Sequence, residues 1–272
     1  MCGRFVATTT PSALGSYFQA LLGSADEVLV PSFNVAPTDA VPAIAVRADG
    51  TRALGPMRWG LVPPWATDLA IGARMINARA ETVAVKPAFR SALRHRRCLV
   101  AADGFYEWER IPRAGAPGAG VDRAGARRTG PRTGIDRGRA GQPWFIRRRD
   151  GAPLAFAGLW ETWRPRRAPA GATPVRTAAV LTTSANAVMV SVHDRMPAML
   201  ERRDWAAWLD PSNDDVATLG ALLVPANDAL LERYPVTSRV NSVRNNGSAL
   251  LEPAELASTP GSSPLAVPLR LL

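Results

Sequence analysis

The chain has 272 residues, 47% of them hydrophobic, which is enough for one large domain or two small ones and excludes disorder throughout. It carries 33 Lys and Arg against 23 Asp and Glu, a formal net charge of +10, and Lys86 is its only lysine. Because arginine presents a rigid fork of donors that suits phosphate, composition makes nucleic acid the first partner to consider.

Two cysteines, Cys2 and Cys98, and two histidines, His95 and His193, offer neither a disulfide framework nor zinc-ligand spacing. We therefore expect no metal and no cofactor. There is no secretory signal and no run near the roughly 18 apolar residues that a membrane span needs, so we expect a cytoplasmic, nucleoid-associated protein with no membrane contact. Phosphate-binding loops, dinucleotide fingerprints and serine-hydrolase elbows are absent from the sequence.

A strand is expected at 2–6, and its first residue, Cys2, follows the initiator Met. Removal of Met1 would leave an α-amine and a thiol on adjacent carbons. An α-amine has a pKa of about 7.7–8.0, against about 10.4 for lysine, so much of it is neutral near pH 7.4 and can attack an aldehyde. The alternative is that Cys2 is a small buried residue at the start of a strand.

The next segments predict a helix and then a hairpin. Residues 11–22 have Thr10 as a cap and Gly23 as a stop, which indicates a helix. Residues 41–47 and 51–59 flank Asp49-Gly50, a pair typical of hairpin turns.

Two tryptophans frame a rigid loop after this hairpin. Pro and Gly residues lie between Trp59 and Trp65, and an exposed tryptophan there can stack on a base, although a core position is the alternative for Trp59. Further on, Asn77 offers an amide and Arg79 a phosphate fork; either can also be structural.

A second helix is expected at 87–94, followed by His95 in a solvated basic run. Strands are expected at 97–101 and 104–108. Strand alternation places Phe105 and Glu107 on one face and Tyr106 and Trp108 on the other. A carboxylate among three aromatic residues is a candidate for partial burial and a raised pKa, with a strand-edge glutamate as the alternative.

Residues 110–141 hold eight Arg, two Asp and many Gly and Pro, and almost no large apolar residue. This composition indicates a flexible insertion between two neighbouring strands. A low-complexity tail is expected at 258–272, and a single domain at 1–257.

The rest of the chain predicts more strands than helices. Residues 144–148 and 154–163 flank Asp150-Gly151, a second expected hairpin, and 175–183 form another strand. Helices are expected at 201–209 and 214–223. Many strands with scattered helices predict an α+β fold with a central, mostly antiparallel, barrel-like sheet and peripheral helices.

His193 lies beside Asp194 and Arg195, a setting suited to proton transfer near neutral pH. The alternative is a loop histidine with a hydrogen-bonded ring.

Eight segments together resemble the SRAP family (SOS response-associated peptidase, also called abasic site processing proteins). The segments run in the expected order over about residues 1–240: 1–5, 33–38, 57–65, 76–82, 98–108, 156–160, 181–183 and 193–197. The chain departs from the family pattern at Ala101, where proline is usual, and in the length of the 110–141 insertion.

The resemblance implies a single SRAP domain, monomeric, that binds single-stranded DNA containing abasic sites in the DNA damage (SOS) response. It implies a thiazolidine crosslink between the mature Cys2 and the ring-opened abasic aldehyde, with AP-lyase and self-processing peptidase activities as possible companions. The implied catalytic residues are Cys2, Asn77, Glu107 and His193. The implied DNA-binding residues are Arg4, Asn34, Trp65, Arg79 and Arg195. The competing hypotheses are a cysteine peptidase or amidase with a terminal nucleophile, and a non-catalytic single-strand binder.

Overall fold

The computed structural model describes residues 2–23, 29–109, 141–165, 169 and 171–255. Its largest sheet closes on itself. Strands β4 (Ala40–Val46), β5 (Arg52–Trp59), β7 (Arg97–Ala102), β10 (Leu154–Trp163) and β11 (Val175–Ser184) pair in a ring, because β11 also bonds to β5. All pairs in the ring are antiparallel except β11–β5. The predicted α+β fold with a barrel-like antiparallel core is confirmed.

Shorter strands extend the barrel at its edges: β2 (Leu21–Leu22), β6 (Asn77–Arg79) and β12 (Arg195–Pro197). A second sheet has the order β13 (Leu231–Pro235), β9 (Gln142–Arg148), β8 (Gly104–Glu109), β1 (Phe5–Ala7) and β3 (Ser32–Val35). It packs against the barrel through aromatic contacts: the Phe5 ring lies 4.9 Å from Trp59, and Phe105 lies 5.9 Å from Phe156.

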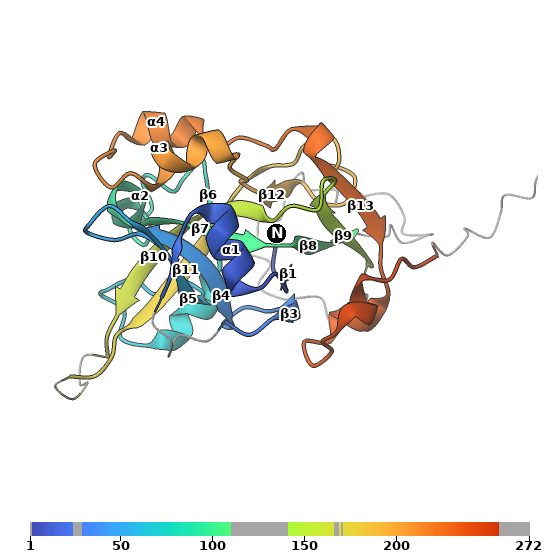
Figure 1. Cartoon of the computed structure of the whole chain (residues 1–272), viewed down its shortest axis with the longest axis horizontal. Coiled ribbons are helices and arrows are strands. Elements are labelled where there is room, and N and C mark those ends of the chain that lie inside the picture. Colours follow the sequence, from blue (N-terminus) through green and yellow to red (C-terminus); the bar gives the residue numbers. More distant parts are fainter. Residues whose placement is uncertain (1, 24–28, 110–140, 166–168, 170, 256–272) are drawn as a thin grey trace, which may run out of the picture.

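The helices are short and cover the barrel. They are α1 (Pro11–Phe18), α2 (Arg90–His95), α3 (Trp205–Leu209) and α4 (Val216–Ala221). Figure 1 shows α2, α3 and α4 together over one side of the barrel, away from β13. The 3-10 turns are η1 (Leu69–Arg74), η2 (Arg202–Asp204), η3 (Asp228–Leu230), η4 (Ser238–Asn241) and η5 (Ser248–Leu251).

Both faces of β7 and of most of β10 and β11 are buried, which explains their continuous apolar runs. In β7, Leu99 and Ala101 face a cluster shared with the helices, including Trp205 and Trp208. The alternate residues of β7 face a cluster shared with the second sheet, including Phe5 and Phe105. The site described below lies on the second of these clusters.

Two local predictions are wrong. The helix predicted at 11–22 ends at Phe18, because Gln19 adopts a left-handed conformation (φ 53°) that caps it. Leu21 and Leu22 instead pair with β5. Asp150-Gly151 forms a turn but no hairpin, since β9 pairs with β8 and β13 while β10 pairs with β7 and β11. A turn pair predicts that the chain reverses direction. It does not predict which strands pair, because that depends on how the two sheets pack together.

The predicted insertion at 110–141 lies almost wholly outside the described residues, as does the predicted tail at 258–272. The strands on either side of the insertion do pair directly, with Glu109 opposite Gln142. The described residues that flank the insertion therefore lie side by side at one end of the β8–β9 pair.

We predict that replacing residues 111–140 with a short Gly/Ser loop leaves the fold intact. The Glu109–Gln142 register keeps the ends together, and shortening a loop changes its closure free energy by only about 1–2 kcal/mol. Thermal unfolding followed by circular dichroism should show a midpoint within about 5 °C of the wild type. A much lower midpoint would mean that the segment packs into the fold.

Gly104→Ala is the destabilising control for this experiment. A Cβ at Gly104 would lie 2.3 Å from Cζ of the buried Phe145 and 2.7 Å from the Ile146 carbonyl oxygen. Neither atom can move without breaking the β8–β9 packing, so the melting midpoint should fall by several degrees.

Candidate functional site

Cys2 lies just before β1 and is fully buried in the cluster between the barrel and the second sheet. Burial raises the pKa of its thiol well above the usual range, and the negative charge of Glu107 raises it further. The positive charge of the N-terminal amine and a hydrogen bond with the Arg4 backbone act in the opposite direction but are smaller. The thiol is therefore held in its protonated form.

Asn77 holds the backbone of Cys2 in place. Its amide Nδ2 donates a 2.6 Å hydrogen bond to the Cys2 carbonyl oxygen. Its Oδ1 is buried and has no hydrogen-bond partner among the described residues. The Nδ2 group thus holds the backbone of Cys2, while Oδ1 remains available as a hydrogen-bond acceptor.

The loop at 60–76 brings Asn77 to this position. Gly60 (φ 124°) and Gly72 lie back to back, so that a Cβ on Gly72 would come within 2.4 Å of the Gly60 carbonyl oxygen. Trp59 is buried and donates its indole N–H to the Ile76 carbonyl oxygen, so it is a core tryptophan. Trp65, on the same loop, is 55% exposed.

Glu107 is buried (3% exposed) in the middle of β8. Its neighbour Phe105 belongs to the Cys2 cluster, whereas Tyr106 and Trp108 pack in a separate cluster on the other face. This confirms the predicted alternation. The Tyr106 N–H donates to the Arg4 carbonyl oxygen, so Glu107, the next residue of β8, lies beside the segment that carries Cys2, and its charge raises the thiol pKa.

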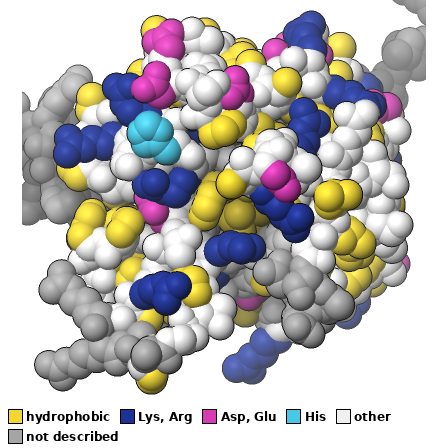
Figure 2. Space-filling model, turned by 60° about the vertical axis from the view of Figure 1, so that its left-hand side comes forward, with side chains coloured by type: hydrophobic (Ala, Val, Ile, Leu, Met, Phe, Trp, Pro, Cys, Tyr) yellow, Lys and Arg dark blue, Asp and Glu magenta, His cyan; other side chains and the backbone are white. Residues whose placement is uncertain are grey.

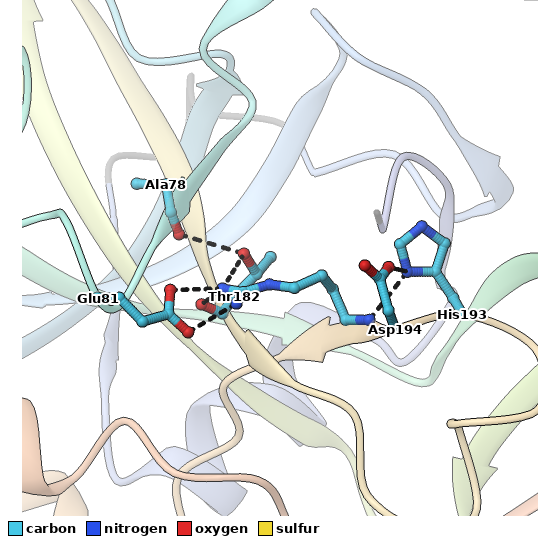
Figure 3. A network of polar contacts seen from close by, with 6 residues as sticks. Ala78, Glu81, Thr182, His193 and Asp194 are labelled. Atoms are coloured by element: carbon cyan, nitrogen blue, oxygen red, sulfur yellow. Dashed lines mark hydrogen bonds and ion pairs between the residues drawn. The ribbon is translucent and has the colours of Figure 1, made fainter. Parts of the chain in front are cut away.

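His193 and Arg195 lie where the chain enters β12 (Figure 3). The side chain of His193 is 18% exposed, and its Nδ1 accepts a 2.9 Å hydrogen bond from the Arg195 backbone N–H. The Arg195 guanidinium forms a bidentate ion pair with Glu81, at 2.6 and 2.9 Å, and also donates to the Thr182 carbonyl oxygen.

β11 joins these pieces. It pairs in parallel with β6, where Val180 lies opposite Asn77 and Thr182 opposite Arg79. It pairs antiparallel with β12, where Ser184 lies opposite Arg195. The residues predicted from two distant parts of the sequence, 77–79 and 193–195, therefore lie beside one strand.

The predicted DNA-binding residues differ in how they are held. Arg79 is exposed, with no side-chain hydrogen bond within the described part of the chain. Arg4 and Asn34 bind the protein itself: Arg4 donates to Asn34 Oδ1 (2.7 Å) and to the Val240 carbonyl oxygen (2.9 Å). The Asn34 amide donates to the carbonyl oxygens of Ser242 and Asn245. Burial also lowers the pKa of Arg4. Both residues thus tie the chain after β13 to β1 and β3.

Sequence reasoning did not single out Glu81 or Thr182. Glu81 lies two residues after Arg79 in a stretch of polar side chains, and this spacing of opposite charges was the available signal. Its partner, Arg195, lies 114 residues away, which spacing cannot reveal.

Other features of the surface lie apart from this site. A cavity of about 230 Å³ is bordered by α4, the 199–204 segment and β13, and none of the candidate residues lines it. On the face in Figure 2, Lys and Arg side chains lie in separate groups among acidic and apolar ones. Among the described residues, no group of His, Cys, Asp and Glu is arranged to hold a metal ion, and no helix is long and apolar enough to cross a membrane.

Comparison with known proteins gives consistent results. The family described as SOS response associated peptidase (SRAP) matches residues 1–243. The chain is 38% identical over 252 residues to abasic site processing protein YoqW of Bacillus subtilis, covering 93% of this chain and 99% of the relative. It is 31% identical over 256 residues to abasic site processing protein HMCES of Gallus gallus, covering 83% and 67%. In fold, it resembles a crystal structure of a Bacteroides thetaiotaomicron protein (TM-score 0.73, 20% identity, covering 93% and 100%).

We predict that Asn34→Ala destabilises the protein by about 2–4 kcal/mol, because it leaves buried partners of the Asn34 amide unsatisfied. Urea unfolding measures this change. Asn241→Ala is the matched control: Asn241 is exposed and accepts one bond, from Trp108, so its loss should cost less than about 1 kcal/mol. Equal effects of the two substitutions would contradict the role assigned to Asn34.

Proposed function

The chain belongs to the SRAP family, and from this we propose that it captures abasic sites in single-stranded DNA by forming a covalent thiazolidine with Cys2 after Met1 is removed. The observation that carries the proposal is the convergence on Cys2: its carbonyl oxygen is held by Asn77, and its thiol lies within range of the buried Glu107. The names of the relatives, abasic site processing proteins, support DNA with abasic sites as the substrate.

The α-amine attacks first in this mechanism. A raised thiol pKa keeps the sulfur protonated and weakly nucleophilic. The amine instead has a pKa of about 7.7–8.0, which leaves a useful neutral fraction. Its nitrogen bonds to the aldehyde carbon, and the carbinolamine loses water to give an imine.

The thiol then closes the ring. Its sulfur bonds to the imine carbon and its proton passes to the nitrogen, so the whole sequence releases one water molecule. An imine at the sugar carbon also acidifies the neighbouring C–H, which opens a route to β-elimination and strand cleavage. Ring closure diverts the imine into a stable adduct, so the protein acts once, as a shield.

Three side chains serve these steps. Glu107 takes and returns the proton that moves between sulfur and nitrogen. Asn77 holds the terminus, and its buried Oδ1 is an acceptor that the mature α-amine can satisfy. His193 gives a proton to the sugar oxygen as the ring opens to the aldehyde.

DNA binding falls chiefly to the exposed residues. Arg79 offers its charge to a phosphate, and the half-exposed Trp65 offers a surface for a splayed base. Arg4 and Asn34 contribute indirectly, because their hydrogen bonds hold the chain after β13 in place.

The peptidase alternative needs a reactive thiolate to attack an amide. The raised pKa of the Cys2 thiol weighs against it as the main activity. Removal of Met1 is the self-processing step that the proposal itself requires. Catalytic turnover of a peptide or amide would favour the alternative.

We predict that Cys2→Ala abolishes the stable adduct with an abasic oligonucleotide, and that Cys2→Ser gives only an imine that borohydride traps. Intact mass spectrometry of the wild type should show loss of Met1, then a gain equal to the oligonucleotide minus one water. Cys98→Ala is the matched control, since Cys98 is equally buried and its thiol pKa is also raised. A stable adduct on Cys2→Ala would disprove the mechanism.

We also predict that Arg79 contributes to DNA binding and Glu107 to adduct formation, so that each substitution impairs one of the two. Arg79→Ala should weaken binding to intact single strands and reduce the salt dependence by about one phosphate contact. Glu107→Gln should leave that affinity nearly unchanged but slow adduct formation by about 100-fold, the scale of general acid–base catalysis.

Fluorescence anisotropy across a salt titration measures binding, and gel-resolved time courses measure the adduct. Arg47→Ala is the control for charge alone, because Arg47 is an exposed arginine at the far end of the β4–β5 hairpin. Equal loss of binding in Arg79→Ala, Glu107→Gln and Arg47→Ala would contradict this division.

A further inference from the structure

Glu81, two residues after β6, forms an ion pair with Arg195, the first residue of β12. Figure 3 shows Glu81 beside Thr182 in this network. Both guanidinium nitrogens Nη1 and Nη2 of Arg195 donate to the Glu81 carboxylate, and Nη2 also donates to the Thr182 carbonyl oxygen at 2.6 Å. These bonds lower the pKa of Glu81, so the carboxylate stays ionised near neutral pH. The Arg195 side chain is only 15% exposed, so the pair is partly shielded from water.

The same residue fixes the neighbouring imidazole through its backbone. The Arg195 N–H donates to His193 Nδ1 at 2.9 Å, and the Asp194 carboxylate also lies 2.9 Å from this nitrogen. In a neutral ring Nδ1 cannot both accept from the N–H and donate to the carboxylate. Asp194 is 88% exposed, so solvent weakens its interaction with Nδ1. Arg195 is instead held at two places, by pairing of its backbone with Ser184 and by the bonds of its guanidinium to Glu81 and Thr182.

The hydrogen bond from the Arg195 backbone N–H therefore determines which nitrogen of the neutral His193 ring carries the proton. Nδ1 is the acceptor, which leaves the proton on Nε2. Asp194 becomes the partner of Nδ1 only when the ring is doubly protonated.

We propose that Glu81 is a positioning residue for His193. By gripping the Arg195 side chain, it holds the Arg195 backbone N–H against Nδ1 and so keeps the neutral imidazole in the form that carries its proton on Nε2. The consequence for reaction rate rests on the function proposed above: with Nε2–H in place, His193 faces its substrate as a proton donor.

The proton position can be tested without DNA. In protein labelled with nitrogen-15, histidine nitrogen chemical shifts distinguish a protonated ring nitrogen from an acceptor. His95→Gln removes the other histidine, which is exposed on α2. At about pH 8, where a histidine with an ordinary pKa of about 6.5 is neutral, we expect Nδ1 to give an acceptor shift and Nε2 a protonated shift. In Glu81→Gln the two shifts should move toward each other as both forms become populated.

Glu232→Gln is the matched control, since Glu232 also pairs with an arginine, Arg147, at 2.8 Å on the second sheet. It should leave the histidine shifts unchanged. Thermal melts of both variants verify folding, which Glu81→Gln should preserve because the Glu81 side chain is 53% exposed.

Reaction with an abasic oligonucleotide gives the second readout. Glu81→Gln should slow adduct formation by about 10-fold to 100-fold, a part of the general acid contribution. Its affinity for intact single strands should stay equal or rise, because a negative charge is lost beside Arg195 and Arg79. If the only role of Glu81 were to compete with DNA phosphate for Arg195, Glu81→Gln would increase both the affinity for single strands and the rate of adduct formation.

Two results would overturn the proposal. One is a wild-type ring that carries its neutral proton on Nδ1, which needs no variant to observe. The other is a folded Glu81→Gln protein whose histidine shifts match those of Glu232→Gln. Failure of the wild type to form any adduct would count against the proposed function alone, because the nitrogen shifts decide the role of Glu81 independently.

Discussion

The pairing of β6 and β12 with β11 around Thr182 is the constraint on which the site depends. β6 lies opposite Val180–Thr182 in parallel register, while β12 pairs antiparallel with the end of the same strand. The Thr182 carbonyl oxygen accepts from both the Ala80 backbone N–H and the Arg195 guanidinium. The segments 77–79 and 195–197 are far apart in the sequence, and they lie beside one strand because both pair with residues 180–184 of β11.

Burial of Cys2 determines the protonation state of its thiol. Burial and the nearby carboxylate keep the thiol protonated, and they outweigh the positive charge of the N-terminal amine, which acts in the opposite direction. A site built for thiolate attack would make a positive charge the dominant influence on the sulfur. The placement of Glu107 therefore suits a reaction in which the sulfur acts second and gives up its proton as it bonds.

Local signals in the sequence were sufficient for most strands and for the alternation that buries Glu107, because period-2 patterning reports directly which side of a strand is covered. They failed where distant packing decides. Leu21 and Leu22 carry a helical spacing, yet they pair with β5. Asp150-Gly151 is a sound turn pair, but the strands on its two sides belong to different sheets.

The same limit applies to the polar residues of the site. Asn77 and Glu107 were identified from residue type and setting together with the family resemblance, and the structure brings both to Cys2. The side-chain partners of Arg4, Asn34 and Arg195 lie 13 to 236 positions away, so no spacing rule could separate an arginine held by the protein from an exposed one.

The short segment from Asn77 to Glu81 shows how few residues can serve several tasks. Asn77 reaches the chain terminus, Arg79 reaches the surface, and Glu81 reaches Arg195 on β12. The buried Ala78 between them packs into the barrel core. A one-residue slip of β6 along β11 would exchange the inward and outward side chains and undo the grip on Cys2. The two tight glycines, Gly60 and Gly72, oppose such a slip, because their close backbone contact ties the loop before β6 to the end of β5.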